Sequence, residues 1–416
     1  MDQIFQDFPT LQRTATDIIT ADELHARLAT GRPLRIKYGV DVTAPFLHIG
    51  HAVNLWAMRE MQQAGHKVVL LIGDFTTRIG DPTGKAASRP VITAEQIDRD
   101  AEEFVAQASR VLLTDPAVLE VRRNSEWWTP MPLDTFLGLL SQVTHARLIQ
   151  RDMFASRIAA GSEIYMHELL YPVLQGYDSC ELSSDLTIVG TDQLFNELMG
   201  RFLAERLGVP PQVVITTEIT PGIDGRAKQS KSLGNYIALN DSARDMFGKA
   251  MKLPDRLVTA YLRSYTMVPL PDIASMDAAM TGGELNPMEA KRTLGRSLVE
   301  RYYSAAEADH EAEWFNRVFS GRSLPEDVPE VAVADPNSTL VEILRHCLPT
   351  ESTSQLRRLI ADGSVRLDGI RKLTDPDQRH PLSSGEVIRI GKRRWRRVTF
   401  GRNGTAPDRA GTHGGG

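Results

Sequence analysis

The chain has 416 residues, of which 42% are hydrophobic and 24% are charged, and its formal net charge is −5. This composition is typical of a globular protein with two or three domains and excludes a fibrous or low-complexity chain. The two cysteines, Cys180 and Cys347, lack paired spacing, so we expect neither a disulfide framework nor a zinc site, and a cytoplasmic location is expected.

The charge is unevenly distributed along the chain. Residues 338–416 contain 15 Lys and Arg against 8 Asp and Glu, whereas residues 1–337 contain 33 against 45. A basic appendage on an acidic body favours contact with a polyanion, and a basic tail that only aids solubility is the alternative. Residues 1–20 lack the pattern of an export signal and no apolar run has membrane-spanning length, so neither export nor membrane insertion is expected.

The first half of the chain has the pattern of an α/β domain. Residues 34–40 predict a short buried strand, a helix is expected from His48, and residues 67–73 form a nearly continuous apolar run. Two buried strands joined by a helix favour a parallel sheet with both faces covered. Residues 186–190 and 213–216 predict further strands, and residues from about 94 to 170 predict a helical insertion. We expect this domain to span residues 1–240.

The second half predicts a different organisation. Residues 241–320 have helical periodicity and predict an α-helical domain. Residues 321–337 contain three prolines without a helical period, which indicates a linker. Residues 338–402 predict a compact basic domain, and the Gly-rich residues 403–416 predict a disordered tail.

Residues 39–51 combine a strand end, a turn and a helix start around His48-Ile-Gly-His51. Two imidazoles at a helix N-terminus can donate to phosphate oxygens, with the helix dipole assisting, while Gly50 lets an adenine ring approach the backbone. Alone, this tetrapeptide is a weak indicator of catalysis.

A second motif, Lys228-Gln-Ser-Lys-Ser232, lies far downstream. Two lysines three residues apart in a loop can bracket a pyrophosphate leaving group and neutralise its growing charge, and a solvated basic loop is the alternative. Together and in this order, the two motifs resemble the signatures of class I aminoacyl-tRNA synthetases. Gln229 departs from the Met that is usual in that family, so we expect altered loop packing more than lost chemistry.

The resemblance narrows to bacterial-type tyrosyl-tRNA synthetases and covers nearly the whole chain. Residues 71–85 resemble the second-strand segment of that family, and Arg89 follows in its usual place. The resemblance implies a Rossmann-like class I catalytic core, an α-helical domain and a small α+β S4 RNA-binding domain. It also implies that Thr76 and Asp81 contact the ammonium group of the amino acid. Lys85 and Arg89, on a loop, would reach the pyrophosphate in the transition state.

The choice of amino acid is expected to depend on Tyr171, Gln175 and Asp178. Their spacing of four and three residues places them on one face of a helix. The resemblance implies that Tyr171 and Gln175 hold the amino and backbone groups of tyrosine, and that Asp178 accepts a hydrogen bond from its phenol. Phenylalanine would leave that buried carboxylate unpaired, so no editing domain is required. A core or capping network is the alternative for these three residues.

Residues 189–196 resemble the Gly-Gly-Thr/Ser-Asp-Gln stretch of the family, which implies that Asp192 holds the ribose hydroxyls and Gln193 the activated carboxyl. Val189 replaces a glycine, and Thr187 stands where Gln or Glu is usual, so both are expected to alter the pocket. Lys37 stands where many members have Tyr, within a Lys-x-Gly string that fits a second branch of the family.

The resemblance thus implies three sets of site residues. The catalytic set is His48, His51, Lys85, Arg89, Lys228 and Lys231. The ATP-binding set is Gly39, Asp41, Thr43, His48, Gly50, His51, Gly190, Asp192, Lys228, Ser230 and Lys231. The tyrosine-binding set is Lys37, Tyr38, Thr76, Asp81, Tyr171, Gln175, Asp178 and Gln193.

Residues 338–400 resemble an S4 RNA-binding domain, with a helix that ends at Gly363 and is followed by a strand. A basic surface of this kind recognises the shape and backbone of RNA, and a solvated basic face without a partner is the alternative. The expected RNA-binding residues are Arg357, Arg358, Arg371, Lys392, Arg393 and Arg394, with Arg396 and Arg397 continuing the strip around Trp395.

The implied function is that of a tyrosine–tRNA ligase. ATP with Mg²⁺ would activate L-tyrosine to tyrosyl-adenylate, without a tightly bound protein metal, and the tyrosyl group would pass to tRNA(Tyr) on a homodimeric enzyme. Thr187, Val189 and Gln229 motivate one alternative, a paralogue that activates a tyrosine analogue or serves as a biosynthetic or resistant copy. The other alternative is a non-catalytic RNA-binding protein that kept the fold.

Overall fold

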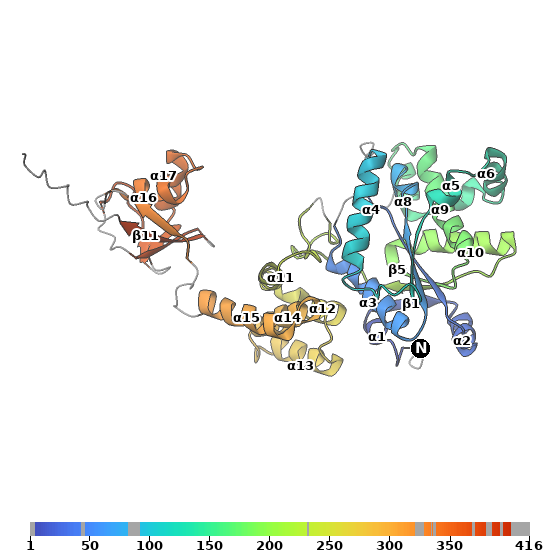
Figure 1. The fold of residues 1–416 in the computed structure, drawn as a ribbon, viewed down its shortest axis with the longest axis horizontal. Coiled ribbons are helices and arrows are strands. Elements are labelled where there is room, and N and C mark those ends of the chain that lie inside the picture. Colours follow the sequence, from blue (N-terminus) through green and yellow to red (C-terminus); the bar gives the residue numbers. More distant parts are fainter. Residues whose placement is uncertain are drawn as a thin grey trace, which may run out of the picture. The chain divides into compact units, whose positions relative to one another are not determined.

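The computed structural model describes residues 5–42, 46–81, 92–230, 233–320, 328–333, 335, 338–367, 371–379, 385–391 and 394–400. The chain divides into two compact units, residues 1–311 and residues 312–416 (Figure 1). No helix in these ranges is both long and apolar enough to cross a membrane.

A six-stranded sheet forms the centre of the first unit, in the order β1-β6-β5-β2-β3-β4. All neighbouring strands are parallel except β1, which pairs antiparallel with β6. Strands β2, β3, β5 and β6 confirm the four strands predicted from the sequence. Their continuous apolar runs are buried between helices. The strand bounds are β1 Ala15–Ile19, β2 Arg35–Val40, β3 Lys67–Ile72, β4 Leu119–Arg123, β5 Leu186–Gly190 and β6 Val213–Thr217.

Two edge strands were not predicted. Strand β1 lies at one edge, and β4 extends the other edge beside β3, so the predicted helical insertion over residues 94–170 is interrupted by a strand. Both strands lie at an edge of the described sheet, so each has a neighbouring strand on one side only. Polar residues are common in such edge strands, and β1 and β4 both contain them. That composition weakens the apolar signal on which the prediction of β2, β3, β5 and β6 depended.

Helices cover both faces of this sheet. The strand order runs from β2 to β4 in one direction and from β5 to β6 in the other, so right-handed crossovers place α4 and α10 on opposite faces (Figure 1). Helices α9 and α10 pack backbone to backbone, because a Cβ on Gly176 would lie 2.8 Å from the Gly200 nitrogen. The helices of this part are α1 Pro9–Thr14, α2 Ala21–Ala29, α3 Ile49–Gln63, α4 Ala94–Ala108, α5 Ser125–Trp128, α6 Leu133–Leu140, α7 His145–Ile149, α8 Asp152–Ala159, α9 Met166–Glu181 and α10 Leu194–Leu207.

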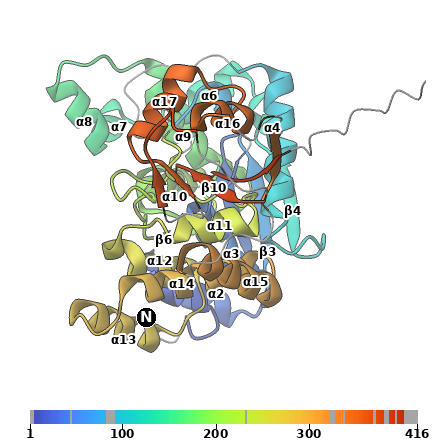
Figure 2. The same ribbon diagram turned by 90° about the vertical axis from the view of Figure 1, so that its left-hand side faces the viewer.

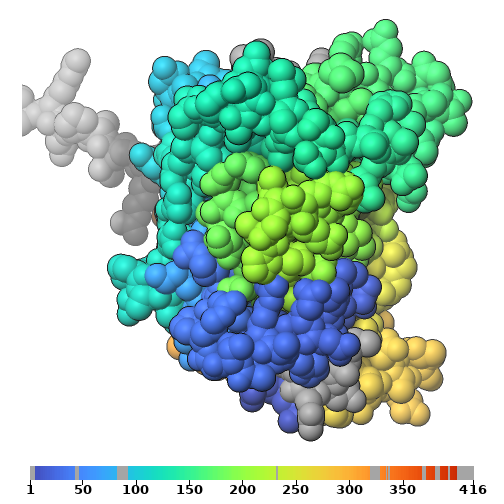
Figure 3. Space-filling view, turned by 90° about the vertical axis from the view of Figure 1, so that its right-hand side faces the viewer, coloured from blue at the N-terminus to red at the C-terminus, as the bar shows by residue number. Residues whose placement is uncertain are grey.

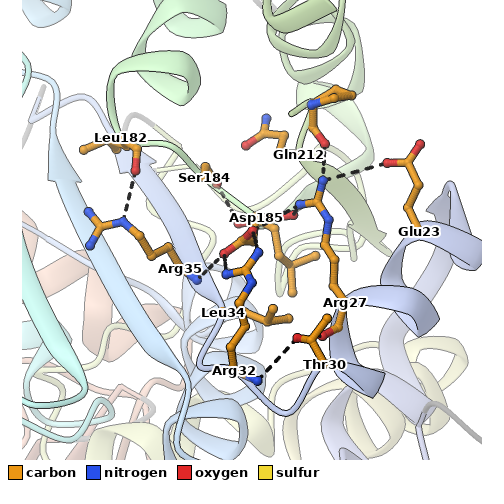
Figure 4. Close-up of polar contacts among 12 residues, drawn as sticks. Glu23, Arg27, Thr30, Arg32, Leu34, Arg35, Leu182, Ser184, Asp185 and Gln212 are labelled. Carbon is orange, nitrogen blue, oxygen red and sulfur yellow. Dashed lines mark hydrogen bonds and ion pairs between the residues drawn. The ribbon is translucent and has the colours of Figure 1, made fainter. Parts of the chain in front are cut away.

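Asp185 fixes the amino ends of the central strands (Figure 4). Its carboxylate accepts hydrogen bonds from the guanidinium of Arg32 and, at 3.0 Å, from the backbone N–H of Arg35. Arg27 on α2 donates to the carbonyl of Asp185. These contacts join α2 to β2 and β5 at the end of the sheet opposite to the carboxyl ends of its strands.

The predicted helical region follows the sheet, and its residues 241–311 belong to the same compact unit, whereas residues 312–320 fall in the second unit. Helices α11, α12 and α14 pack side by side (Figure 2). Helix α14 also reaches α3, where Trp56 donates to the Tyr302 hydroxyl at 3.2 Å and Arg301 lies 4.5 Å from the Trp56 ring centre. The bounds are α11 Ala243–Ala250, α12 Val258–Tyr265, α13 Leu270–Thr281, α14 Pro287–Tyr302 and α15 Ala305–Phe315, with a π-helical turn at Asn316–Ser320.

The second unit contains a mixed five-stranded sheet in the order β7-β11-β10-β8-β9. Two helices, α16 Leu340–Cys347 and α17 Thr353–Ala361, share one apolar core with it. The predicted linker over residues 321–337 was wrong in part, since residues 330–333 pair with β11 as a parallel strand that prolines flank in the sequence. The strand bounds are β7 Glu330–Val333, β8 Val365–Leu367, β9 Arg371–Leu373, β10 Val387–Ile390 and β11 Arg394–Phe400.

Candidate active site

A cavity of about 330 Å³ opens at the carboxyl ends of the parallel strands. Ligands of open parallel α/β sheets bind at this position, where the strand order reverses between β2 and β5. The cavity brings together residues that the sequence analysis predicted from separate motifs, namely Lys37, Tyr38, Gly39, Asp41, His48, Gly50, His51, Thr76, Asp81, Tyr171, Gln175, Asp178, Gly190, Asp192, Gln193 and Lys228.

Five predicted residues are not among the residues that line this cavity. Thr43, Lys85, Arg89 and Lys231 lie outside the described residues. Ser230 is described, and its backbone N–H donates to Asn235 at 2.8 Å.

His48 and His51 stand at the start of α3 as predicted. His48 is the N-cap residue, and its backbone N–H donates to Nδ1 of His51 at 3.3 Å. Neutral His51 therefore carries its proton on Nε2. The two ring centres are 3.8 Å apart. A side chain at position 50 would collide with this pair, since a Cβ on Gly50 would lie 2.9 Å from Nδ1 of His48.

Backbone pairing joins the two signatures. The N–H of Ile49 donates to the carbonyl of Ile237 at 3.0 Å, and the N–H of Leu239 donates to the carbonyl of Leu47 at 2.9 Å. The chain just after the Lys228 loop therefore runs along the His48 segment. At the other side of the cavity, Lys228 Nζ lies 2.7 Å from Asp192 Oδ2, which gives the lysine an anionic partner between the two segments.

Gln229 holds the same loop to the helical region. Its side chain is buried, and Nε2 donates to the hydroxyl of Tyr265 on α12 at 2.7 Å. The Tyr265 and Thr220 hydroxyls bond to each other in turn. Gln229 thus anchors the loop through a buried hydrogen-bond network with Tyr265 and Thr220.

A network of hydrogen bonds connects the predicted ATP and tyrosine residues. Asp41 accepts from Thr76 at 2.7 Å and from the hydroxyl of Tyr171 at 3.0 Å. Burial, followed by the charge of Asp41, raises the pKa of Tyr171 well above its usual value, so Tyr171 remains a neutral donor. Gly73 makes room for this contact, because a Cβ there would lie 2.4 Å from Oγ1 of Thr76.

Asp178 lines the cavity and accepts from three donors that the sequence analysis did not identify. The indole N–H groups of Trp127 and Trp128 donate to Oδ1 at 2.8 and 2.7 Å. Asn124 donates to Oδ2 at 3.2 Å and to Thr76 at 3.0 Å. Burial raises the pKa of Asp178 to about 7, although these donors and Lys37 oppose the shift. Oδ2 therefore retains acceptor capacity for a further donor such as a phenol.

This pKa gives an expected pH dependence. Below about pH 7 the neutral form of Asp178 predominates and presents a hydroxyl in place of one acceptor oxygen. The resemblance implies that this oxygen would accept from the phenol of tyrosine. In ATP–pyrophosphate exchange, kcat/KM for tyrosine is expected to fall about tenfold per pH unit below that value. Asp178→Asn should remove this bend and leave only the dependence of other groups. An unchanged bend in the variant would assign the titration to a different residue.

Asp81 and Gln193 both line the cavity and are in direct contact. Gln193 Nε2 donates to Asp81 Oδ2 at 2.9 Å, and Gln193 Oε1 accepts from Asn196 at 3.0 Å. Arg151, a buried residue that the sequence analysis missed, interacts electrostatically with Asp81 and Asp192. Among the described residues that line the cavity, carboxylates outnumber lysines, which favours a cationic group of a ligand inside it.

The two departures in β5 have different consequences. Val189 lines the cavity, and its carbonyl accepts from Thr217 at 3.2 Å. Thr187 is fully buried and donates to the carbonyl of Lys37 at 3.1 Å. The ammonium of Lys37 is bound instead by Glu197 on α10, another residue that the sequence analysis missed.

The predicted RNA-binding residues lie in the second unit. Arg357 on α17 is exposed and pairs with Asp377, Arg394 lies 3.4 Å from Glu351, and Arg358 is exposed. The side chain of Arg371, and residues Lys392 and Arg393, lie outside the described parts. Arg396 and Arg397, which continue the predicted basic strip around Trp395, donate to backbone carbonyls.

A further basic row crosses the sheet of this unit. Lys372, Arg366, Arg389 and Trp395 are successive cross-strand partners on β9, β8, β10 and β11. The guanidinium of Arg389 lies 5.6 Å from the Trp395 ring centre. No described carboxylate pairs with these three cations, and like charges directly opposite one another are unfavourable without an anion.

Comparisons with known proteins agree with this site. The family of class I tRNA synthetases (W and Y) matches residues 29–320. The tyrosine–tRNA ligase of Moorella thermoacetica is 40% identical over 95% of this chain and 96% of that protein. The tyrosine–tRNA ligase of Oleidesulfovibrio alaskensis is 41% identical over 94% of this chain and 98% of that protein.

Solved structures share the fold. A C-terminally truncated mitochondrial tyrosyl-tRNA synthetase of Aspergillus nidulans has a TM-score of 0.59 at 22% identity, over 76% of this chain and 96% of that chain. The Archaeoglobus fulgidus tyrosyl-tRNA synthetase complexed with L-tyrosine has a TM-score of 0.58 at 20% identity, over 74% of this chain and 100% of that chain. The expected Rossmann-like core is therefore confirmed, and the chain belongs to the tyrosyl-tRNA synthetases of the class I (W and Y) family.

Proposed function

We propose that the chain is a tyrosine–tRNA ligase that forms tyrosyl-adenylate in the cavity and then transfers the tyrosyl group to tRNA(Tyr). One observation carries the proposal: Asp178, Tyr171 and Gln175 line the same cavity as His48, His51 and Lys228. An acceptor for a phenol and donors for phosphates therefore lie together. This juxtaposition is what the attack of a tyrosine carboxylate on the α-phosphate of ATP requires.

The first group of residues would bind tyrosine. Asp178 accepts from the phenol, while Asp81, Tyr171 and Gln175 surround the ammonium group. Gln193, which donates to Asp81, would hold the carboxylate that attacks. Tyr171 stays neutral, so the set offers hydrogen bonds and the carboxyl group of Asp81 to a cation.

The second group would act on ATP. His51 offers Nε2–H, and Lys228 leaves Asp192 to reach the phosphates, so that Asp192 becomes available to the ribose hydroxyls. Lys231, Lys85 and Arg89 would add charge to the departing pyrophosphate. Mg²⁺ enters with ATP, bound by phosphate oxygens. Catalysis then consists of positioning and compensation of the charge that develops on the phosphates.

The second unit would bind tRNA. Its exposed arginines on α17 and the row of Lys372, Arg366 and Arg389 offer charge to phosphates, and Trp395 offers a ring on which a base can stack. We propose that the enzyme works in the cytoplasm, consistent with two free thiols, Cys180 and Cys347.

Removal of residues 321–416 tests this division of labour. The cut precedes β7, so no strand of the second sheet is left behind. Tyrosine-dependent ATP–pyrophosphate exchange by residues 1–320 is expected to stay within about twofold of the full chain. Charging of tRNA(Tyr) should fall about 10²-fold in kcat/KM at 0.15 M salt, because phosphate contacts are lost. Equal loss of exchange and charging would contradict the proposed division of labour. Unchanged charging by residues 1–320 would show that residues 321–416 do not bind tRNA.

We also propose that the enzyme is a homodimer. Among the described residues, five large exposed apolar side chains gather within residues 133–166, namely Leu133, Leu137, Ile158, Tyr165 and Met166. The segment from α6 to α8 forms the upper part of the face in Figure 3, in teal to green. Such exposure favours burial against a second copy. Sedimentation should give twice the chain mass, and Leu137→Asp with Met166→Asp should give one chain mass. A wild-type monomer would contradict the proposal.

A further inference from the structure

A buried ion pair lies in the wall of the tyrosine cavity. Lys37 on β2 and Glu197 on α10 are each 2% exposed, and Nζ lies 2.8 Å from Oε2. Lys37 also donates to Ser179 Oγ at 2.7 Å. Both charged residues line the cavity. Burial of two charges costs free energy that their attraction seldom exceeds, so the pair is not explained by stability alone.

The carboxylate of Glu197 determines how the Gln175 amide is oriented. A carboxylate can only accept, and Oε1 of Glu197 accepts from Gln175 Nε2 at 2.8 Å. The other end of the same amide, Gln175 Oε1, accepts from Asn196 at 2.8 Å. The amide is therefore fixed from both ends: Nε2 lies against Glu197, and Oε1, which accepts from Asn196, keeps a second lone pair for a further donor in the cavity. A reversed amide would place donors against a bound ammonium.

Glu197 also compensates for the short side chain of Thr187 in β5. The resemblance to the family implies a long polar side chain at position 187, where this chain has Thr187. The Thr187 hydroxyl donates to the Lys37 backbone, not to its ammonium. Glu197 supplies a long polar side chain from α10 instead, and Gln212 Nε2 donates to its second oxygen at 2.6 Å.

We propose that Glu197, held in place by Lys37, is a positioning residue that fixes the Gln175 amide so that its oxygen accepts from the substrate ammonium group. The proposal rests on the proposed function, because it requires an amino acid whose ammonium lies beside Gln175. It assigns the ion pair to tyrosine affinity and not to the phosphate chemistry at the other side of the cavity.

A double-mutant cycle between Glu197→Gln and Gln175→Leu tests this role in ATP–pyrophosphate exchange by the full chain. Each single change should raise KM for tyrosine about tenfold or more, while KM for ATP stays within about twofold. Adding Glu197→Gln to Gln175→Leu should change KM for tyrosine little further, because its effect passes through the amide. Independent multiplication of the two effects, or an equal change in KM for ATP, would overturn the proposal.

A neutral version of the pair keeps the test decisive if Glu197→Gln alone does not fold. In Lys37→Met with Glu197→Gln, the new amide can accept from Gln175 Nε2. Its own N–H can then meet Gln212, whose Oε1 has no partner among the described residues and can turn toward it. KM for tyrosine should recover to within about threefold of wild type. A loss above tenfold in this folded variant would overturn the proposal.

Asp185→Asn is the matched control. Asp185 is also a buried carboxylate with arginine partners, but it lies at the opposite end of β5 (Figure 4). It should lower the melting temperature without raising KM for tyrosine. If wild-type protein exchanges no pyrophosphate with tyrosine, the proposed function fails. If wild type is active and Glu197→Gln matches it, only the positioning role fails.

Discussion

Asp178→Asn is expected to lower kcat/KM for tyrosine about 10²-fold in ATP–pyrophosphate exchange, because a charge-assisted hydrogen bond to the phenol is lost. The asparagine oxygen can still accept from Trp127 and Trp128. Its amide group, however, places a donor against Asn124 where Oδ2 accepted at 3.2 Å. Activation of phenylalanine has no phenol to lose and should change little, so selectivity for tyrosine should fall by nearly the same factor.

Glu181→Gln is the control for this variant. Glu181 lies three residues further along α9 and is exposed, so it shares the helix without facing the cavity. Its activity should match wild type. Equal losses with tyrosine and phenylalanine in Asp178→Asn would show that the change damages the site as a whole and that Asp178 does not bind the phenol.

Lys228→Ala is expected to lower kcat of adenylate formation by about 10²–10³-fold, because a cation that meets charge developing on the phosphates is removed. KM for tyrosine should stay within about twofold, since Lys228 pairs with Asp192 at the phosphate side of the cavity. Single-turnover formation of tyrosyl-adenylate measures the rate, and equilibrium binding of tyrosine measures the affinity.

The neighbouring Arg226→Ala provides the comparison, because Arg226 is an exposed cation of the same loop that does not line the cavity. It should retain wild-type kcat. A loss of tyrosine affinity in Lys228→Ala without a loss of kcat would contradict a role in phosphate chemistry.

The interior strands could be predicted because they are continuous apolar runs. The 67–72 segment, Lys-Val-Val-Leu-Leu-Ile, is buried on both faces and needs no distant partner to be recognised. The edge strands β1, β4 and β7 could not be predicted, since each is defined by pairing with one remote strand and carries polar residues. Their positions are a property of the assembled sheet.

Residues of the cavity could be predicted from the sequence where they belong to a short contiguous motif, as in His48-Ile-Gly-His51. Glu197 belongs to no such motif. It is, however, a carboxylate on the buried side of α10, next to Asn196 and near Gly200, and a buried carboxylate in a helix could have indicated a functional residue. Asp178 is contacted by Asn124, Trp127 and Trp128, which lie at least 50 residues away in the sequence. Their role therefore becomes visible only in the folded chain.

The central claim is that the cavity activates tyrosine, and ATP–pyrophosphate exchange over a panel of amino acids tests it most directly. The panel should contain tyrosine, phenylalanine, tryptophan and ring-substituted tyrosines, because Val189 lines the cavity and Lys37 lies in its wall. We predict the highest kcat/KM for tyrosine, with phenylalanine far below it. A substituted tyrosine as the best substrate would contradict the assignment of Asp178 to the phenol of tyrosine, and the absence of exchange with every amino acid would contradict catalysis itself.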